Sequence, residues 1–240
     1  MILAAGKGRR LGELGRTRAK CMLRVDGTPL IERIVSNLYT AGVRSLVVNL
    51  HHRGDEVKAH LDSLSYSDLQ LAFSKEDGLL GTGGAIKNAK DHIFGCRDLL
   101  VHNGDIFWEG DLRSIIDEHQ RSGADATLLV GEATENRALL FDERGYLRAW
   151  TDGESCLGGP CPEGSRLLGY RGIQILSAKF YDVMEEQGRV FSLVDTWLLA
   201  LEKGFDIGSY ETRQALWMDI GTPERLRRLR RTLAQRRGRS

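Results

Sequence analysis

Apolar and polar residues alternate along the first 130 positions of this chain in two different periods. Short apolar runs of the kind found in buried strands occupy residues 2–5, 45–50, 69–73, 98–102 and 127–130. Between these runs, apolar residues recur every three or four positions, which predicts helices over 28–41, 55–64 and 112–119. Strands of this buried type, alternating with helices, predict an α/β protein with a doubly wound, mostly parallel sheet.

Individual residues predict where the helices begin and end. Thr28 followed by Pro29 supplies a capping hydroxyl and a proline for the first helical position. Gly42 predicts the end of that helix, and Asp55 is expected to cap the next one.

The order of predicted elements changes in the second half of the chain, where the regular alternation breaks between residues 137 and 171. The patterns there predict a hairpin at 139–141 and 146–150, a loop at 151–165, a strand at 172–176 and a helix at 195–203. We find no internal repeat.

Composition is that of an ordinary globular protein: 240 residues, of which 41% are hydrophobic and 28% charged. A formal net charge of +1 gives no overall attraction to nucleic acid or to a membrane, and no signal peptide or long apolar run is present. Cys156 and Cys161 do not have a zinc-site spacing. We therefore expect a cytoplasmic protein with all four cysteines, Cys21 and Cys96 included, as free thiols.

The first ten residues carry the strongest candidate for chemistry. The apolar run 2–5 leads directly into Gly6-Lys7-Gly8-Arg9-Arg10. Glycines at 6 and 8 tolerate positive φ and let backbone N–H groups approach an anion. Lysine and arginine add donors suited to phosphate oxygens. The spacing matches neither the P-loop nor the dinucleotide-binding pattern, and a plain turn after a strand is the alternative.

Two aspartates are candidate metal ligands, because each follows an apolar segment that predicts a strand. Asp105 lies in Asn103-Gly104-Asp105, and Asp219 lies before a helix opened by Thr222 and Pro223. Ligands of open α/β sheets bind beyond the carboxyl ends of the strands, so one cleft is expected to collect both turns and the Gly6 turn. Two carboxylates could hold one Mg²⁺ on nucleotide phosphates. The alternative for each is a helix cap or an Asx turn.

Two further segments have weaker signals. Residues 80–86 form a glycine-rich run with Thr82, which would let the backbone pass close to a base or a sugar; an ordinary glycine-rich loop is the alternative. Lys20 precedes an apolar stretch and could reach a phosphate, or it could be a surface lysine.

Taken together, these motifs resemble the sugar-1-phosphate nucleotidyltransferases, or NDP-sugar pyrophosphorylases. The resemblance spans residue 1 to about residue 229, and its motifs are residues 3–11, Lys20, 80–84, 103–105 and 219–224. The chain looks closest to short single-domain members such as N-acetylmuramate-1-phosphate uridylyltransferases and heptose- or mannose-1-phosphate guanylyltransferases. It departs from the family in having Ala19 where proline is usual. It also lacks a residue or two before the first strand, a Glu-Lys-Pro segment and a hexapeptide-repeat extension.

The resemblance implies a Rossmann-like three-layer α/β/α sandwich with a mostly parallel mixed sheet. It implies one nucleotidyltransferase domain over residues 1–233, with a sugar-binding side at about 131–215, and we expect a flexible basic tail at 234–240.

The same resemblance implies a set of site residues and Mg²⁺ as cofactor. Catalytic roles fall to Arg10, Lys20 and Asp105, and the metal would be held by Asp105 and Asp219. The implied nucleotide-binding residues are Leu3, Ala4, Ala5, Gly6, Lys7, Gly8, Arg9, Gly81, Thr82 and Asn103.

The implied partners are an NTP and a sugar 1-phosphate, which give an NDP-sugar for cell-envelope synthesis and pyrophosphate. Ala4-Ala5-Gly6 favours UTP, whereas residues 80–86 suit a GTP-dependent enzyme equally well. Because a phosphate oxygen is already ionised, no general base is needed, and His51, His52 and His102 are expected to be structural. The resemblance leaves open whether the protein forms a homodimer.

The arginine-rich C-terminal segment leaves a second class of function open, a non-catalytic nucleotide-sugar or RNA-binding module. Its arginines are Arg225, Arg227, Arg228, Arg230, Arg231, Arg236, Arg237 and Arg239. We prefer a solvated helix with three leucines facing inward, and expect no nucleic-acid or membrane partner, because the whole-chain charge is near neutral.

Overall fold

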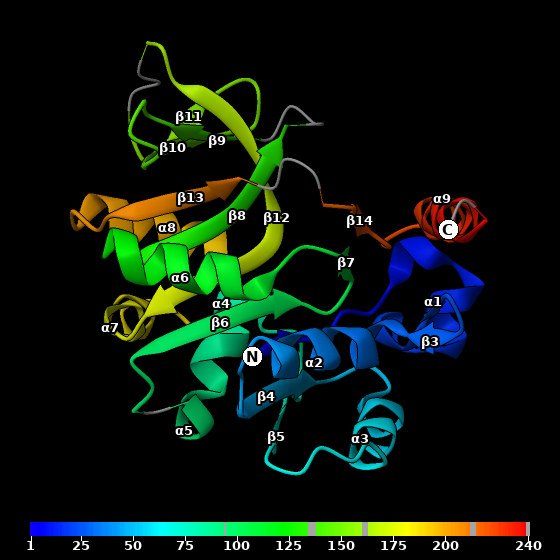
Figure 1. Ribbon diagram of the computed structural model, residues 1–240. Helices are drawn as coiled ribbons and strands as arrows, with labels where there is room; N and C mark the ends of the chain where they lie inside the picture. Colours follow the sequence, from blue (N-terminus) through cyan, green and yellow to red (C-terminus); the bar gives the residue numbers. More distant parts are fainter. Residues whose placement is uncertain (94, 134–137, 160–162, 212–214, 239–240) are drawn as a thin grey trace. The chain divides into compact units, whose positions relative to one another are not determined.

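The computed structural model describes residues 1–93, 95–133, 138–159, 163–211 and 215–238 (Figure 1). The chain separates into two compact units. Unit 1 comprises residues 1–79, 102–110 and 215–240, and unit 2 comprises residues 80–101 and 111–214. The expectation of one nucleotidyltransferase domain over residues 1–233 stays a prediction.

Unit 1 contains a parallel sheet with β1 at its centre. Its strands are β1 (Ile2–Leu3), β2 (Arg24–Val25), β3 (Thr28–Pro29), β4 (Ser45–Leu50), β5 (Gln70–Lys75), β7 (Ile106–Trp108), β14 (Trp217–Asp219) and the last two residues of β6 (Asp98–Asn103). Its helices are η1 (Arg9–Leu11), α1 (Glu13–Thr17), η2 (Lys20–Met22), α2 (Leu30–Thr40), α3 (Gly54–Asp62) and α9 (Pro223–Arg237). Strand β1 pairs in parallel with β4 on one side and β6 on the other, and β4 pairs in parallel with β5. The carboxyl ends of these strands therefore meet at one edge.

Two predicted helix starts are wrong. Thr28 and Pro29 form strand β3, which pairs with β2, so the helix begins at Leu30 and Pro29 occupies its N-cap position without a side-chain cap. Asp55 lies inside the first turn of α3, whose N-cap residue is Arg53. In both cases the neighbouring chain decides the backbone, which overrides the local capping preference.

Unit 2 contains a largely antiparallel sheet. Its strands are β8 (Ala126–Glu132), β9 (Ala138–Phe141), β10 (Leu147–Thr151), β11 (Cys156–Leu157), β12 (Arg166–Ser177), β13 (Ile207–Glu211) and the first residues of β6. Its helices are α4 (Gly81–Asn88), α5 (Lys90–Ile93), α6 (Leu112–Ser122), α7 (Lys179–Glu185) and α8 (Leu193–Glu202). The β9–β10 hairpin is confirmed. Strand β12 is much longer than predicted because it pairs with β9 over its first residues and with β8 beyond them. The predicted α/β class with a mixed sheet is confirmed.

Helix α9 extends beyond its predicted end. Leu226, Leu229 and Leu233 are buried as expected, but the helix continues to Arg237. The expectation of an unordered segment from residue 234 is therefore wrong for 234–237. Arg236 forms an ion pair with Glu109 at 2.7 Å, and Arg237 pairs with Asp26, so polar contacts extend the helix without an apolar repeat.

The cysteines differ from one another. Cys21 and Cys96 are free thiols, as predicted, and burial raises the pKa of the Cys21 thiol to about 12. Cys156 is disulfide-bonded, so the expectation of a free thiol is wrong there, and Cys161 lies outside the described residues. A sequence spacing that is unsuited to zinc does not exclude a disulfide bond. A disulfide requires two cysteines with Cα atoms within about 7 Å and with suitably directed Cβ atoms. No helix in the described ranges is long and apolar enough to span a membrane.

Candidate functional site

The N-terminal turn leaves strand β1 at the carboxyl edge of the unit 1 sheet. Gly8 has φ +59°, and its carbonyl accepts a hydrogen bond from the Leu11 N–H at 2.9 Å, which closes the first turn of η1. Gly15 packs so close that a Cβ there would lie 2.2 Å from the Gly8 carbonyl oxygen. Gly6 has no positive φ, and a Cβ there would meet nothing within 4 Å. Positive φ is therefore needed at Gly8 but not at Gly6.

The three cations of this turn are exposed to solvent. Lys7, Arg9 and Arg10 all have exposed side chains, and none forms an ion pair with another described residue. Within the described part of the chain no carboxylate neutralises their positive charge, which leaves it available to an anionic ligand.

The Asn103-Gly104-Asp105 turn lies directly against the end of β1. The Gly104 N–H donates to the Leu3 carbonyl at 2.8 Å, and a Cβ at Gly104 would lie 2.8 Å from the same oxygen. Only glycine fits this close approach of two backbones. The turn thus brings Asp105 beside the N-terminal turn, as the sequence predicts.

Lys20, Asp105 and Asp219 gather in one cluster, which we call the charge cluster. The Lys20 ammonium donates to Asp105 Oδ2 and lies 3.7 Å from Asp219 Oδ1. Strand β14 brings Asp219 there by pairing with β7, and the Ile220 N–H donates to the Asp105 carbonyl at 3.0 Å. Three predicted site residues, up to 199 positions apart in sequence, therefore meet within unit 1.

Arg10 reaches the same cluster. A Cβ built on Gly221 would lie 2.6 Å from Asp219 Oδ1, 2.9 Å from Arg10 Nη2 and 3.1 Å from Lys20 Nζ. Gly221 is therefore surrounded by two cations and a carboxylate, and its missing side chain is what lets them approach one another.

Arg225 is a functional candidate that the sequence analysis did not single out. Its Nη1 donates to Asp219 Oδ2 at 2.8 Å, while the Gly221 N–H donates to Asp219 Oδ1. Thr222 caps α9 by accepting from the Arg225 N–H at 3.3 Å, which places the arginine on the first turn. The sequence pattern groups Arg225 with the basic C-terminal segment, although its position three residues after a capping threonine indicates the first turn of a helix.

Asn49 and Glu76 were also missed. Both are buried, with 3% and 6% of their surfaces exposed, at the carboxyl ends of β4 and β5. Asn49 Oδ1 accepts from the Ala4 N–H at 2.6 Å, and Asn49 Nδ2 donates to Glu76 Oε1 at 2.6 Å. The sequence signal was a polar residue near the end of an otherwise apolar strand.

Gly81 and Thr82 belong to unit 2. Gly81 has φ +76°, and a Cβ there would lie 2.3 Å from the Phe191 carbonyl oxygen. Thr82 Oγ1 accepts from the Leu193 N–H at 2.9 Å. Both residues therefore pack against the segment before α8, and their role at the nucleotide stays a prediction.

The histidines of unit 1 have structural partners. His51 Nδ1 lies 2.9 Å from the Glu76 carbonyl oxygen, and His52 Nε2 lies 3.0 Å from the Gly15 carbonyl oxygen. His102 is buried, and burial lowers the pKa of its imidazole to about 4. His102 Nδ1 lies 2.8 Å from the Asn103 carbonyl oxygen, so this histidine also has a backbone partner.

The donor set of the charge cluster fits a Mg²⁺ ion that arrives with phosphates. Mg²⁺ commonly uses one or two protein carboxylates, completing its shell with waters and substrate oxygens. Asp105 and Asp219 supply two carboxylates that already share one cation, Lys20. Among the described residues, no group of three or more His, Cys, Asp or Glu side chains gathers as a self-sufficient metal site.

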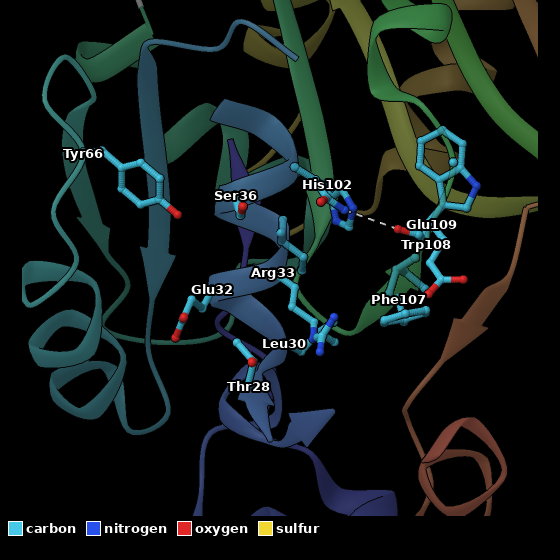
Figure 2. Close-up of a pocket in the computed structure, with 14 residues that line it drawn as sticks. Thr28, Leu30, Glu32, Arg33, Ser36, Tyr66, His102, Phe107, Trp108 and Glu109 are labelled. Atoms are coloured by element: carbon cyan, nitrogen blue, oxygen red, sulfur yellow. Dashed lines mark hydrogen bonds between the residues drawn. The ribbon is translucent and has the colours of Figure 1, made fainter. Parts of the chain in front are cut away.

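A hollow in unit 1, of about 440 Å³, is lined by none of the predicted site residues. Figure 2 shows His102 between helix α2 and the segment that carries Trp108 and Glu109. Asn37 Nδ2 donates to the Trp108 carbonyl at 3.4 Å across this hollow. Arg33, on α2, is bonded to the Val25 carbonyl at 3.0 Å.

A family model described as "Nucleotidyl transferase" matches residues 1–142. N-acetylmuramate alpha-1-phosphate uridylyltransferase of Caulobacter vibrioides is 29% identical over 234 residues, which cover 93% of this chain and 92% of that protein. Mannose-1-phosphate guanylyltransferase of Mycobacterium tuberculosis is 30% identical over 139 residues, 58% of this chain. The matched segment spans only 38% of that second protein.

Among solved structures, HddC from Yersinia pseudotuberculosis is similar with a TM-score of 0.75 and 25% identity, covering 97% of both chains. A similarity over nearly the whole chain confirms the predicted Rossmann-like α/β fold with its mixed sheet.

Proposed function

Because the chain belongs to the nucleotidyl transferase family, we propose that it joins an NTP to a sugar 1-phosphate, giving an NDP-sugar and pyrophosphate. The observation that carries this proposal is the charge cluster, in which Arg10 approaches Lys20, Asp105 and Asp219 beside the N-terminal turn. Cations and carboxylates at the carboxyl edge of a parallel sheet suit a polyphosphate with its metal ion.

In the proposed reaction, an oxygen of the sugar 1-phosphate attacks the α-phosphorus of the NTP. The new P–O bond forms as the bond between the α-phosphorus and the oxygen bridging the α- and β-phosphates breaks. Pyrophosphate leaves with the electron pair of that broken bond. The attacking oxygen carries no proton at neutral pH, so no base has to remove one.

Both reactants are anions that repel each other, so the protein has to supply positive charge. Lys7, Arg9 and Arg10, which are exposed and form no ion pair with the described residues, would bind the triphosphate. Arg10 and Lys20 would stabilise the charge that grows on the α-phosphate and the leaving pyrophosphate. Holding the attacking oxygen in line with the α-phosphorus contributes the rest of the rate enhancement.

Asp105 and Asp219 would hold the divalent cation, with Arg225 fixing the orientation of Asp219. A bound Mg²⁺ would supply further charge neutralisation of the phosphates.

We propose UTP as the nucleotide, since the uridylyltransferase of Caulobacter vibrioides matches nearly the full length of both chains. GTP is the second candidate, because a guanylyltransferase is 30% identical over the matched segment. Residues 131–215 would form the sugar-binding side. A cytoplasmic location and a homodimer belong to the same proposal.

The experiment is a matrix of four NTPs against a panel of sugar 1-phosphates, with pyrophosphate release as the signal and Asp105→Asn as the inactive control. Release with one NTP and one sugar phosphate supports the proposal and names the substrates. Tight binding of a nucleotide sugar without any release would favour a non-catalytic binding module instead.

A further inference from the structure

We propose that Asn49 and Glu76 form a buried relay that positions the N-terminal phosphate-binding turn through the Ala4 backbone. This inference rests on the proposed function, since it assigns the turn to phosphate binding. Asn49 and Glu76 are positioning residues in this account, because they touch Ala4 and each other rather than a reacting atom.

The relay starts where the β1 ladder ends. Leu3 is opposite Asn49 in the parallel pairing of β1 with β4, and Leu3 is the last residue of β1. Ala4 is only 7% exposed, so its N–H needs a partner within the protein. The side chain of Asn49 supplies that partner at 2.6 Å, so the Ala4 N–H bonds to a side chain and not to the backbone of a neighbouring strand. The chain turns away from the sheet at this point.

Glu76 fixes which way the Asn49 amide faces. Glu76 Oε1 accepts from Asn49 Nδ2 at 2.6 Å, which leaves the amide oxygen directed at Ala4. The backbone of Glu76 is anchored on both sides. Its N–H donates to the Leu50 carbonyl at 2.8 Å, and its carbonyl oxygen lies 2.9 Å from His51 Nδ1. The carboxylate itself is held by its bond to Asn49 and by burial, since only 6% of the residue is exposed.

The placement of a carboxylate here indicates more than core filling. Burying an acidic group is costly unless it is hydrogen-bonded, and Glu76 meets that need by accepting from Asn49. The relay ends at Ala4, two residues before the glycine turn that carries Lys7, Arg9 and Arg10. A turn that is already ordered before the ligand arrives loses less conformational entropy on binding. The ligand therefore binds more tightly.

The test measures the Kd of magnesium pyrophosphate by calorimetry on the full chain, together with the thermal midpoint of each variant. Pyrophosphate probes the turn without involving the base or the sugar. Asn49→Leu, which removes the acceptor at similar volume, should weaken binding at least tenfold. Glu76→Leu should do the same, and Glu76→Gln, which keeps an acceptor oxygen, should stay within about threefold of the parent.

Reversing the polarity of the relay gives a sharper test. Asn49→Asp places two carboxylates face to face and should weaken binding. Combining Asn49→Asp with Glu76→Gln restores one donor and one acceptor, since glutamine can donate to the new carboxylate while Ala4 keeps its acceptor. The double variant should recover most of the affinity. This pair decides the matter if Asn49→Leu does not fold.

The matched control is Thr127→Val in unit 2. Thr127 is 1% exposed, and its hydroxyl lies 2.9 Å from His119 Nδ1, so its loss also removes a buried polar contact. The control should lower the thermal midpoint without changing the pyrophosphate Kd. The relay is overturned if folded Asn49→Leu, or folded Asn49→Asp, binds pyrophosphate as tightly as the parent. A parent protein that neither binds nor releases pyrophosphate would overturn the proposed function itself.

Discussion

Replacing Gly221 by alanine tests the charge cluster without removing any of its charges. The new Cβ would lie 2.6 Å from Asp219 Oδ1, 2.9 Å from Arg10 Nη2 and 3.1 Å from Lys20 Nζ, whereas ordinary contact begins at 3.4 Å. Gly221 does not have a positive φ, so alanine adds no backbone strain. In the folded state the substitution therefore acts by pushing three functional side chains apart.

Two effects on stability oppose each other. Moving Asp219 away weakens the charge-assisted bond from the Gly221 N–H, and such bonds contribute roughly 1.5–3 kcal/mol. Replacing glycine by alanine stabilises by about 0.4–1 kcal/mol through the unfolded chain. We expect a net loss of roughly 1 kcal/mol, which for a protein of this size lowers the Tm by about 2–4 °C.

The effect on turnover should be larger than the effect on stability. Misplacing a catalytic group by about 1 Å can cost on the order of 100-fold, so kcat/KM should fall by about 10- to 100-fold. The assay is pyrophosphate release at saturating Mg²⁺, with the Tm measured in parallel. Gly78→Ala is the matched control, because a Cβ there meets nothing within 4 Å and its φ is not positive. Parent-like kcat/KM for Gly221→Ala would show that the cluster does not act in the reaction.

Four further predictions concern single features. Arg10→Ala should lower kcat more than it raises the KM for the NTP, and Arg10→Lys should rescue poorly because the guanidinium fork is lost; a pure KM effect would make Arg10 a ground-state binding residue. Asp105→Asn should abolish most turnover and raise the Mg²⁺ concentration needed, and parent-like rates at saturating Mg²⁺ would contradict the metal assignment. Burial lowers the pKa of His102 to about 4, so the unfolded chain takes up a proton first as the pH falls. Stability should therefore decrease by up to about 3 kcal/mol between pH 6.5 and 4, and His102→Gln should flatten this slope in urea titrations. Removing residues 234–240 should leave kcat/KM within a few-fold and the Tm nearly unchanged, since exposed ion pairs such as Arg236–Glu109 contribute little; a collapse of activity in the folded truncation would show that the segment reaches the substrate or a neighbouring subunit.

The sequence by itself determined the parts of this protein that depend on neighbouring residues. Apolar runs and helical periodicity located β1, β4, β5, α2 and α3 of unit 1, because burial of one face requires that spacing. The turn at residues 6–10 could also be recognised from sequence, because the positive φ at Gly8 is a local requirement that favours glycine. The candidate aspartates were recognisable from their positions after predicted strands.

Only the tertiary structure decided which of these residues meet. Asp219 reaches Asp105 because β14 pairs with β7, a non-local contact that no window of sequence contains. The role of Arg225 is likewise a tertiary matter. The sequence groups this residue with the basic C-terminal segment, and in the fold its guanidinium donates to the Asp219 carboxylate.

Non-local contacts also explain the misassigned elements and the missed relay. Thr28 and Pro29 are good helix starters that become a strand, because β2 lies beside them. Asn49 is an ordinary polar residue in an apolar strand until β1 and Glu76 come to flank it. Local preferences amount to about 1 kcal/mol per residue, whereas pairing and burial act on whole segments, so the packed neighbours determine the outcome wherever the two disagree.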